Sequence, residues 1–258
     1  MSAVIHATAV VDPEAQLGAD VEIGPYCVLG PRVEVGDGCR LGPHVVLEQN
    51  VRLGREVAIG AGSVLGSDPQ DLKYRGEETW VEIGDRTVIR EHSTVNRGSA
   101  ASGLTSVGAD CFLMTYVHVA HDCRIGAGVT IANSTQLSGH VTIEDRATLS
   151  GLIAIHQFVT IGTFAFVGGA SRVPQDIPPY VKAVGNPIEL FGLNSVGLQR
   201  AGFSPALMAA LKRSYRLLFN SELPRPEAIA ALAPEAAEHA EVRRLIAFVS
   251  QARRGVPA

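Results

Sequence analysis

The sequence has 258 residues, of which 46% are hydrophobic and 19% are charged, and its formal net charge at pH 7 is −4. This length and apolar content allow a substantial buried core, which excludes an intrinsically disordered protein and favours one large domain with an appendage. The acidic balance argues against a general nucleic-acid-binding protein.

The N-terminal segment lacks the features of an export signal. It reads MSAVIHATAVVDPEAQ, without a basic region or a long apolar stretch. No window in the sequence reaches eighteen consecutive apolar residues, so a membrane-spanning helix is not indicated. We therefore expect a cytoplasmic enzyme.

A six-residue repeat dominates the chain. Branched aliphatic residues recur at every sixth position from Leu17 to Leu65, resume in phase at Ile83, and continue unbroken from Leu113 to Val173. A small or aliphatic residue stands two positions before most of them, and a glycine often follows. Because side chains two residues apart share one face of a strand, this spacing indicates short strands. We expect the glycines to permit tight corners between them.

Three hexads complete one coil of eighteen residues, and such coils bury their apolar faces only by stacking on one another. The sequence thus predicts a parallel β-helix of about eight coils, roughly 40 Å long at the usual strand spacing. It does not show the handedness. Cys27, Cys39, Cys111 and Cys123 occupy the small-aliphatic position of their hexads and form no CxxC pair. We expect them to be buried apolar residues without a metal or redox role.

Two segments interrupt the repeat without changing its phase, GSDPQDLKYRGEETWVE at 66–82 and NRGSAASGLTS at 96–106. We expect both to be loops extruded from an intact prism, where solenoids commonly build binding sites. Trp80, the only tryptophan, lies at the end of the first loop. Anchoring that loop on the prism is its expected role, ahead of stacking on a ligand.

Helical patterning follows the end of the repeat at Val173. A long helix should begin with Ser204 as its N-cap and Pro205 at the first helical position. A shorter helix is expected around residues 225–232. The segment APEAAEHAEVRRLIAFVSQARRG predicts a second long helix that ends at Gly255.

The chain therefore divides into a hexapeptide-repeat β-helix over residues 1–190 and an α-helical domain over residues 191–258. The helical part holds nine Lys and Arg against five Glu, a net charge of +4, so the β-helix carries −8. This asymmetry indicates an acidic partner near the C-terminus. A solvated helical face would explain it equally well.

Histidines gather on one corner of the predicted prism. The segment VHVAHDCRIG places His118 and His121 beside Asp122, and His140 and His156 follow. Counted in coils of eighteen, His121, His140 and His156 fall at positions 13, 14 and 12 of three successive coils. A shared corner beside an aspartate indicates a functional site.

Three interpretations of this corner remain open. The histidines of the site could bind zinc, as in a hydration enzyme. Alternatively, His121 could be a general base whose tautomer Asp122 fixes. In the third interpretation, the histidines share no role and the chain is a structural or binding solenoid. The sequence contains no nucleophile elbow, P-loop or GxGxxG motif, so serine catalysis, NTP hydrolysis and dinucleotide binding lack support.

The motifs QDLKYRGE at 70–77, VHVAHDC at 117–123, SGHV at 138–141, AIHQF at 154–158 and QDIPPYV at 175–181 closely resemble those of the UDP-N-acetylglucosamine O-acyltransferases. These enzymes start lipid A biosynthesis, and the likeness covers nearly the whole chain. It implies an all-β left-handed parallel β-helix with a C-terminal α-helical domain, assembled as a homotrimer with active sites between subunits. The implied reaction moves an (R)-3-hydroxyacyl group from acyl carrier protein to the 3-hydroxyl of UDP-N-acetylglucosamine.

The resemblance also implies roles for individual residues. His121 matches the family's general base, Asp122 the residue that orients it, and Gly139 the residue whose backbone N–H stabilises the oxyanion. The positions that line the substrate or reach its nucleotide are matched by Gln70, Asp71, Lys73, His118, His140, His156, Gln157, Asn194 and Arg200. Where the family carries two arginines, Arg200 is followed here by Ala201, so one expected cation for the UDP phosphates is missing.

Gly169 resembles a family position at which a bulky residue stops the acyl chain early. It lies forty-eight residues after His121, and glycine there predicts a preference for longer hydroxyacyl chains. Turn formation is the alternative role of this glycine. We expect no metal and no cofactor beyond the phosphopantetheine arm of acyl carrier protein. The residues expected to help dock that acidic carrier are Lys212, Arg213, Arg216, Arg243 and Arg244.

Overall fold

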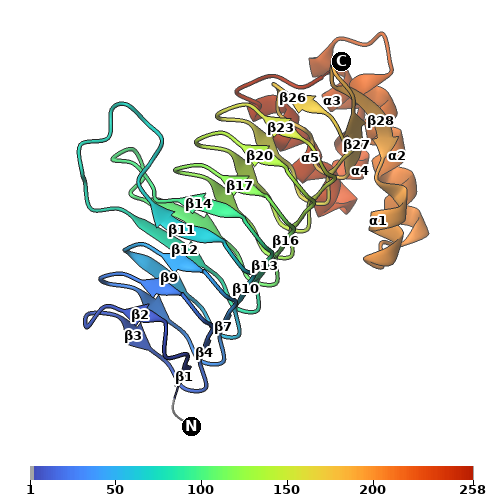
Figure 1. Ribbon diagram of the computed structural model, residues 1–258. Helices are drawn as coiled ribbons and strands as arrows, with labels where there is room; N and C mark the ends of the chain where they lie inside the picture. Colours follow the sequence, from blue (N-terminus) through green and yellow to red (C-terminus); the bar gives the residue numbers. More distant parts are fainter. Residues whose placement is uncertain (1–2, 258) are drawn as a thin grey trace.

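The computed structural model describes residues 3–257, which form a three-sided prism with helices at one end (Figure 1). Each turn of the chain around the prism adds one strand to each of three sheets. Paired positions such as Val119 and Leu137 are one eighteen-residue coil apart, and the pairing is parallel. The predicted parallel β-helix is confirmed.

The first sheet contains β1 (Val4–Ile5), β4 (Glu22–Ile23), β7 (Arg40–Leu41), β10 (Ala58–Ile59), β13 (Val88–Ile89), β16 (Phe112–Leu113), β19 (Thr130–Ile131), β22 (Thr148–Leu149), β25 (Phe166–Val167), β27 (Val181–Val184) and β28 (Glu189–Leu193). The second contains β2 (Val10–Val11), β5 (Val28–Leu29), β8 (Val46–Leu47), β11 (Val64–Ser67), β14 (Thr94–Asn96), β17 (His118–Val119), β20 (Gln136–Leu137), β23 (Ala154–Ile155) and β26 (Arg172–Val173). The third contains β3 (Gln16–Leu17), β6 (Glu34–Val35), β9 (Val51–Leu53), β12 (Trp80–Ile83), β15 (Leu104–Val107), β18 (Arg124–Ile125), β21 (Thr142–Ile143) and β24 (Thr160–Ile161).

We call the edge between the first and second sheets the first corner, that between the second and third sheets the second corner, and the remaining edge the third corner. The second sheet has nine strands within residues 3–257, one for each coil. The prism is therefore longer than the predicted eight coils. The difference arises because coiling already begins at β1, ahead of the first strong hexad at Leu17.

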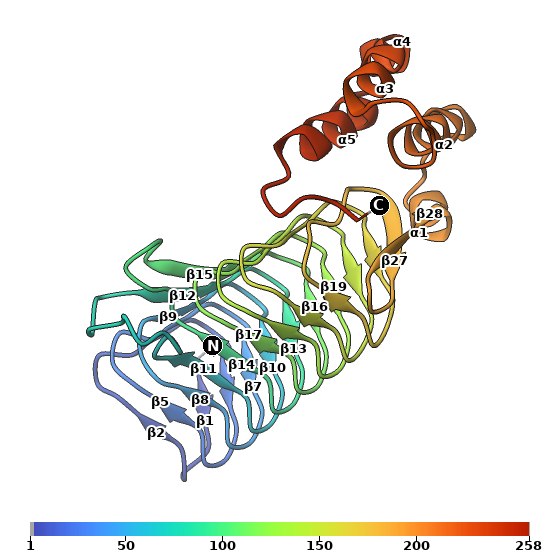
Figure 2. The same ribbon diagram turned by 90° about the horizontal axis from the view of Figure 1, so that it is seen from above.

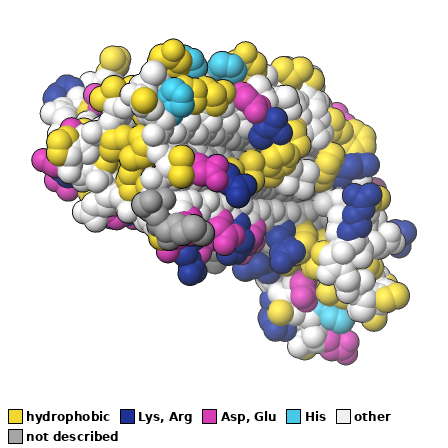
Figure 3. All heavy atoms as spheres, turned by 60° about the horizontal axis from the view of Figure 1, so that its bottom comes forward, with side chains coloured by type: hydrophobic (Ala, Val, Ile, Leu, Met, Phe, Trp, Pro, Cys, Tyr) yellow, Lys and Arg dark blue, Asp and Glu magenta, His cyan; other side chains and the backbone are white. Residues whose placement is uncertain are grey.

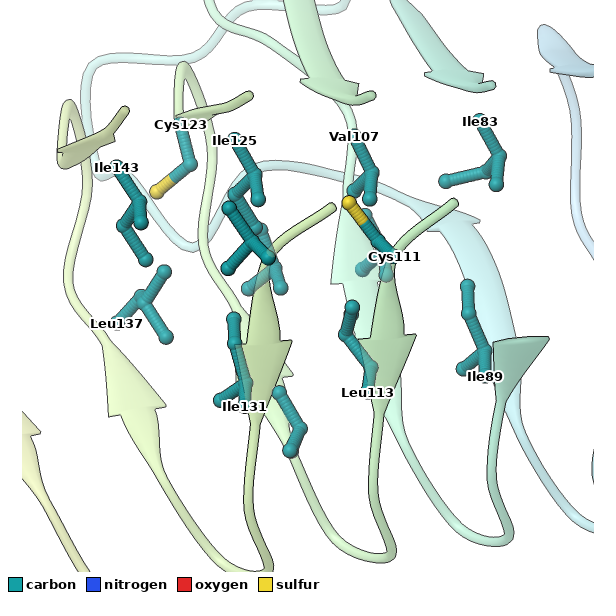
Figure 4. Close-up of a cluster of buried hydrophobic side chains, with 14 of the residues drawn as sticks. Ile83, Ile89, Val107, Cys111, Leu113, Cys123, Ile125, Ile131, Leu137 and Ile143 are labelled. Carbon is teal, nitrogen blue, oxygen red and sulfur yellow. The ribbon is translucent and has the colours of Figure 1, made fainter. Parts of the chain in front are cut away.

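Aliphatic side chains of the repeat fill the prism interior (Figure 4). Leu113, Ile131 and Leu137 have no exposed surface, and they lie in the same cluster as Cys111 and Cys123. All four cysteines are buried and unpaired, which confirms their predicted packing role. Burial raises the pKa of the Cys123 thiol to about 12, so this thiol stays protonated and unreactive at neutral pH.

The corners use glycine in a way that the sequence did not predict. The left-handed backbone conformation falls on residues with side chains at the second corner, namely Asp122 (φ 61°), His140 (φ 62°) and Phe158 (φ 65°). Glycines such as Gly60 instead allow neighbouring coils to approach, since a Cβ there would lie 2.6 Å from the backbone nitrogen of Glu91. The expectation that these glycines shape the turn was wrong. Close stacking of the coils requires them.

Both interruptions of the repeat leave the prism at the second corner, on consecutive coils. One joins β11 to β12 and projects from the side of the prism (Figure 1), and the other joins β14 to β15. Asn96 Nδ2 donates to the carbonyl of Asp68 where the first loop departs (2.8 Å). Asn50 Nδ2 donates to the carbonyl of Thr79 where it returns (2.9 Å). These bonds partly replace the strand pairing that the loop interrupts.

Trp80 packs on the prism at the end of the first loop. The guanidinium carbon of Arg52 lies 3.8 Å from the centroid of its ring, a cation–π contact. Arg52 also forms ion pairs with Glu34 (3.3 Å) and Glu82 (3.0 Å). This arrangement supports the predicted anchoring role of Trp80.

The helices lie beyond the last coils, at the opposite end of the molecule from β1 (Figure 2). They are α1 (Ser195–Arg200), α2 (Pro205–Phe219), α3 (Arg225–Ala231), α4 (Ala233–Glu238) and α5 (Ala240–Gln251). The Ser204 side chain accepts a hydrogen bond from the backbone N–H of Leu207 (3.2 Å), which confirms the predicted N-cap. None of the helices within residues 3–257 is long and apolar enough to cross a membrane.

The second long helix was predicted wrongly. The segment expected to be continuous is divided into α4 and α5 at His239, whose backbone is extended (φ −122°, ψ 117°). Helix α5 also ends at Gln251 rather than at Gly255, and the chain then returns to the prism. Contacts with the prism hold this tail there, because the Asp176 N–H donates to the Gly255 carbonyl (2.9 Å).

The two ends of the prism differ. At the C-terminal end, β28 pairs with β27 in antiparallel fashion, and the returning tail covers the last coil. At the N-terminal end, β1 pairs with β4 on one side only. Val4 and Ile5 of that strand are 67% and 45% exposed. Within residues 3–257, the prism is thus covered at the end that carries the helices but not at the end that carries β1.

Candidate active site

His121 and Asp122 form a hydrogen-bonded pair at the second corner. They lie between β17 and β18, on the coil that follows the two extruded loops. His121 Nδ1 lies 2.8 Å from Asp122 Oδ2, and the two side chains are 12% and 1% exposed. An aspartate that accepts from Nδ1–H leaves the Nε2 of a neutral imidazole free to accept a proton.

The second extruded loop surrounds the Asp122 carboxylate with donors. Ser99 donates through its N–H (3.1 Å) and its hydroxyl (2.7 Å), and the Ser102 hydroxyl donates as well. Burial by itself would raise the pKa of this carboxyl. The hydrogen bonds from Ser102, His121 and Ser99 outweigh it and lower the pKa of Asp122 to about 2. Asp122 is therefore an anion at neutral pH.

Gly139 lies directly over the His121 ring on the next coil. A Cβ at this position would stand 2.6 Å from His121 Cε1 and 2.7 Å from Nε2, so the ring packs where a side chain would otherwise lie. Within residues 3–257 the Gly139 N–H donates no hydrogen bond to the protein. A free backbone N–H therefore lies beside the imidazole. A general base together with a hydrogen-bond donor for an oxyanion would require this arrangement.

His140 completes the immediate cluster. Its ring meets that of His121 edge to face, with centroids 5.1 Å apart, and stacks on Phe158 at 4.5 Å. His140 Nε2 lies 3.8 Å from Asp122 Oδ2. His121, Asp122 and His140 are also the three residues of the described chain whose donor atoms are close enough to hold a metal ion. Both oxygens of Asp122 already accept hydrogen bonds, which is the arrangement expected of a carboxylate that orients a general base.

The other two histidines lie apart from this cluster. His156 follows β23 at the second corner, as predicted, but its Nδ1 contacts Arg254 of the C-terminal tail (3.0 Å). Its position in the coil corresponds to Ala120, one residue before the position of His121. His118 shares a hydrogen bond with Thr94 (2.7 Å), and burial lowers its pKa. The three histidines thus share the second corner as predicted, and of these His121 and His140 have their rings in contact.

The loop residues predicted from the resemblance have different surroundings. Gln70 and His118 line one cavity of about 390 Å³. The Asp71 carboxylate instead closes a turn by accepting from the Lys73 N–H (3.0 Å), while Lys73 itself is exposed. Gln157 is exposed at the second corner, and its carbonyl lies 3.1 Å from His156 Nδ1.

The remaining predicted residues lie away from the second corner. Gly169 is exposed at the first corner, between β25 and β26. Asn194 lies near the third corner, where its Nδ2 donates to the Phe164 carbonyl (3.0 Å) and its Oδ1 caps α1. Arg200 is exposed at the end of α1. One copy of the chain therefore does not bring these three residues to His121.

The sequence analysis missed Ser99, Ser102, Arg97 and Arg254 around this site. Arg97 is only 1% exposed and bonds Asp68 and the Tyr74 hydroxyl, which ties the two loops together. These residues lie outside the hexapeptide repeat, so periodicity gives no signal for them. The eleven-residue interruption holds three of these residues among its serines and its arginine, and Arg254 lies in the C-terminal segment.

Known proteins resemble this chain in both sequence and fold. The model of the Udp N-acetylglucosamine O-acyltransferase domain 2 family matches residues 176–257, and the bacterial transferase hexapeptide model matches residues 32–67 and 105–139. An acyl-[acyl-carrier-protein]--UDP-N-acetylglucosamine O-acyltransferase from Paracidovorax citrulli is 54% identical over 98% of this chain and 98% of its own. The protein of the same name from Thiobacillus denitrificans is 47% identical over 98% and 99%.

A solved structure agrees with this result. The UDP-N-acetylglucosamine acyltransferase from Bacteroides fragilis superposes with a TM-score of 0.96 at 36% identity, over 99% of this chain and all of that one. Together with the hexapeptide match, this likeness confirms the left-handed β-helix with C-terminal helices.

Proposed function

This chain belongs to the UDP-N-acetylglucosamine O-acyltransferase family, and from that premise we propose that His121 is its general base and Asp122 the residue that orients it. The enzyme transfers an acyl group from acyl carrier protein to an oxygen of UDP-N-acetylglucosamine, the first step of lipid A biosynthesis. The observation that carries the proposal is the 2.8 Å contact between His121 Nδ1 and the buried Asp122 carboxylate.

The chemistry assigns each group a step. A sugar hydroxyl is barely ionised at pH 7, so its proton passes to His121 Nε2 as its oxygen attacks the thioester carbonyl. The negative charge that develops on the carbonyl oxygen is stabilised by the Gly139 N–H. The tetrahedral intermediate then expels the phosphopantetheine sulfur as a thiolate, which takes the proton from His121 and becomes the free thiol. No metal, cofactor or covalent enzyme intermediate enters these steps.

The proposed acyl donor is an (R)-3-hydroxyacyl carrier protein, and the proposed acceptor is the sugar 3-hydroxyl. Incubating UDP-N-acetylglucosamine with hydroxyacyl carrier proteins of graded chain length tests both substrates. We expect a new ester on the sugar nucleotide, detected by mass spectrometry. The absence of transfer with every carrier would reject the proposal and favour a binding role for the solenoid. A cytoplasmic location for this reaction stays a prediction.

A homotrimer would complete the site. His121 lies at the second corner, Gly169 at the first and Asn194 near the third, so a single copy cannot gather them. The first corner also carries large exposed apolar side chains, Tyr116 at 56% and Leu152 at 69%, as surfaces for self-association do. We propose that the first corner of one subunit faces the second corner of its neighbour. The acyl chain would then lie between them.

The proposed substrate contacts follow from this assembly. Gln70, Asp71, Lys73, His118, His140, His156 and Gln157 would line the sugar and acyl groups, and Asn194 and Arg200 would reach the nucleotide. The side chain of Asn194 already caps α1, so a contact with the nucleotide would have to coexist with that role. Ala201 supplies no cation. Arg200 is therefore the proposed phosphate contact on α1.

Gly169→Met should shift the preference of the enzyme toward shorter acyl chains. A Cβ at Gly169 would approach the Gly151 carbonyl oxygen at 3.3 Å and Ser150 Cβ at 3.7 Å, with no backbone nearer. The backbone is not left-handed there, so a side chain fits without turn strain. Each methylene that the methionine displaces from a buried groove costs ~0.8 kcal/mol. The ratio of kcat/KM between long and short donors measures the shift.

Gly169→Ala is the matched control and should change that ratio much less. Gly168 is unsuited to the test, since a Cβ there would meet Val184 at 2.6 Å. An unchanged chain-length profile in Gly169→Met, with only stability lowered, would show that the acyl groove runs elsewhere.

Replacement of Lys212 and Arg216 by Glu should raise the KM for acyl carrier protein roughly tenfold at low salt, because exposed charges govern the encounter of such partners. Both side chains are exposed on α2, and several Lys and Arg side chains are visible at this end on the face drawn in Figure 3. Arg213 is less suitable, since it is paired with Glu235 at 2.5 Å. Steady-state kinetics with each substrate varied in turn measures the effect.

The KM for UDP-N-acetylglucosamine should stay constant in this variant, and the defect should shrink at high salt through screening. Arg40→Glu, on the first sheet near the β1 end, is a control that matches the charge change of each single substitution on α2. If neither KM moved, the cationic side chains would form a solvated helical face.

A further inference from the structure

We propose that Ser99 and Ser102 are positioning residues that hold the Asp122 carboxylate in line with His121. Both belong to the second extruded loop, and both donate hydrogen bonds to the Asp122 carboxylate. This role rests on the proposed function, because the orientation of His121 matters only if His121 removes the proton from the sugar.

The hydrogen bonds fix the carboxylate in one plane. Asp122 Oδ1 accepts from the Ser99 N–H (3.1 Å) and from the Ser102 hydroxyl. Asp122 Oδ2 accepts from the Ser99 hydroxyl (2.7 Å) and from His121 Nδ1 (2.8 Å). Since each oxygen is held by the loop, the carboxylate cannot rotate away from His121 without breaking several bonds. The backbone is held too, as the Asp122 N–H donates to Thr105 Oγ1 (2.8 Å).

The loop that carries the serines is itself clamped. Arg97, at its base, is buried and bonds the Gly66 carbonyl, Asp68 and the Tyr74 hydroxyl of the first loop. The Gly98 N–H donates to the Trp80 carbonyl (3.2 Å), where the first loop ends. A rigid support of this kind is what an orienting residue requires. The serines therefore couple the positions of His121 and Asp122 to the positions of both loops.

The serines also influence the charge balance of the pair. The titratable groups around the pair are His140, which lies 3.8 Å from Asp122, the buried thiol of Cys123, and His118, which interacts electrostatically with His121. Removing neutral donors leaves more of the negative charge of Asp122 to interact with a protonated His121. The protonated form of the base should then persist to higher pH.

The test compares Ser99→Ala, Ser102→Ala and the double variant. We expect kcat of the double variant to fall roughly ten- to a hundredfold through misorientation of the base, with the KM for UDP-N-acetylglucosamine unchanged. The acid limb of its kcat/KM profile should move to higher pH. Ser99→Thr keeps the hydroxyl and should restore most of the rate. Ser67→Ala removes a loop hydroxyl that bonds Glu48 instead (2.7 Å) and should leave kcat unchanged.

A double-mutant cycle with Asp122→Ala separates positioning from general damage. If the serines act through Asp122, adding the two serine substitutions to Asp122→Ala should lower kcat by less than a further twofold. Full additivity there, or an unshifted acid limb, would overturn the serine role while leaving His121 as the base. An active His121→Ala variant would overturn the proposed function instead. Should Ser102→Ala disturb the loop, Ser99→Ala alone decides, because it retains the backbone donor to Oδ1.

Discussion

His121→Ala should lower kcat by roughly 10²- to 10⁴-fold, the usual loss when a general base is removed. The fold should survive, because His121 contributes a half-buried ring at a corner and the interior of the prism is built from other residues. The measurement is steady-state turnover of UDP-N-acetylglucosamine with a hydroxyacyl carrier protein, together with a thermal unfolding curve.

His6→Ala provides a matched control, since His6 is an exposed histidine at the other end of the prism. His118→Ala, His140→Ala and His156→Ala should have smaller effects, exerted mainly through substrate positioning. A loss below tenfold in His121→Ala would show that another group is the base. Equal and complete inactivation of all four variants, with stoichiometric zinc in the purified protein, would favour a metal site instead.

Gly139→Ala should be almost as damaging, by roughly 10²-fold in kcat, although it adds a single methyl group. That carbon would stand 2.6 Å from His121 Cε1, so the ring must leave its position against Asp122. Displacement of a catalytic group by about 1 Å costs this much. The atoms that must yield belong to a side chain and not to the backbone, and stability should therefore change little. Comparing kcat with the melting temperature checks both statements.

Gly169→Ala is a suitable control for Gly139→Ala, since its new methyl group would meet nothing closer than 3.3 Å. The N–H of residue 139 persists in the alanine variant. A fully active Gly139→Ala enzyme would therefore mean that His121 tolerates the shift and that the acyl group does not approach this backbone.

The sequence predicted those parts of the fold that depend on local periodicity. The aliphatic repeat indicated the strands and the cysteine packing, because a position that is buried in every hexad is occupied by an apolar residue at every sixth place in the sequence. The turns were harder to interpret. Asp122, His140 and Phe158 adopt the left-handed conformation without being glycines, and stacking between coils explains the glycines better. The break between α4 and α5 at His239 has no capping signal in the sequence.

The candidate site was predictable where its residues share a corner and not where distant segments meet. Coil arithmetic placed His121 and His140 together, since eighteen residues return the chain to the same corner. It could not show that His156 turns to Arg254, which is ninety-eight residues away. Nor could it show that Ser99 and Ser102 bond Asp122, because an extruded loop has no period from which its path could be derived.

The unequal ends of the prism bear on how this molecule loses its structure. In a solenoid each coil is held by its neighbours alone, so melting can proceed one coil at a time. Among the described residues, the strand β1 has a neighbour on one side only, whereas the last coil is covered by the tail and the helices. Fraying should therefore start at the N-terminus and travel toward the coil of His121. Several coils separate the two, and amide hydrogen exchange would accordingly be fast at one end while the catalytic corner stays protected. The first coils can therefore unfold locally while the active site remains folded.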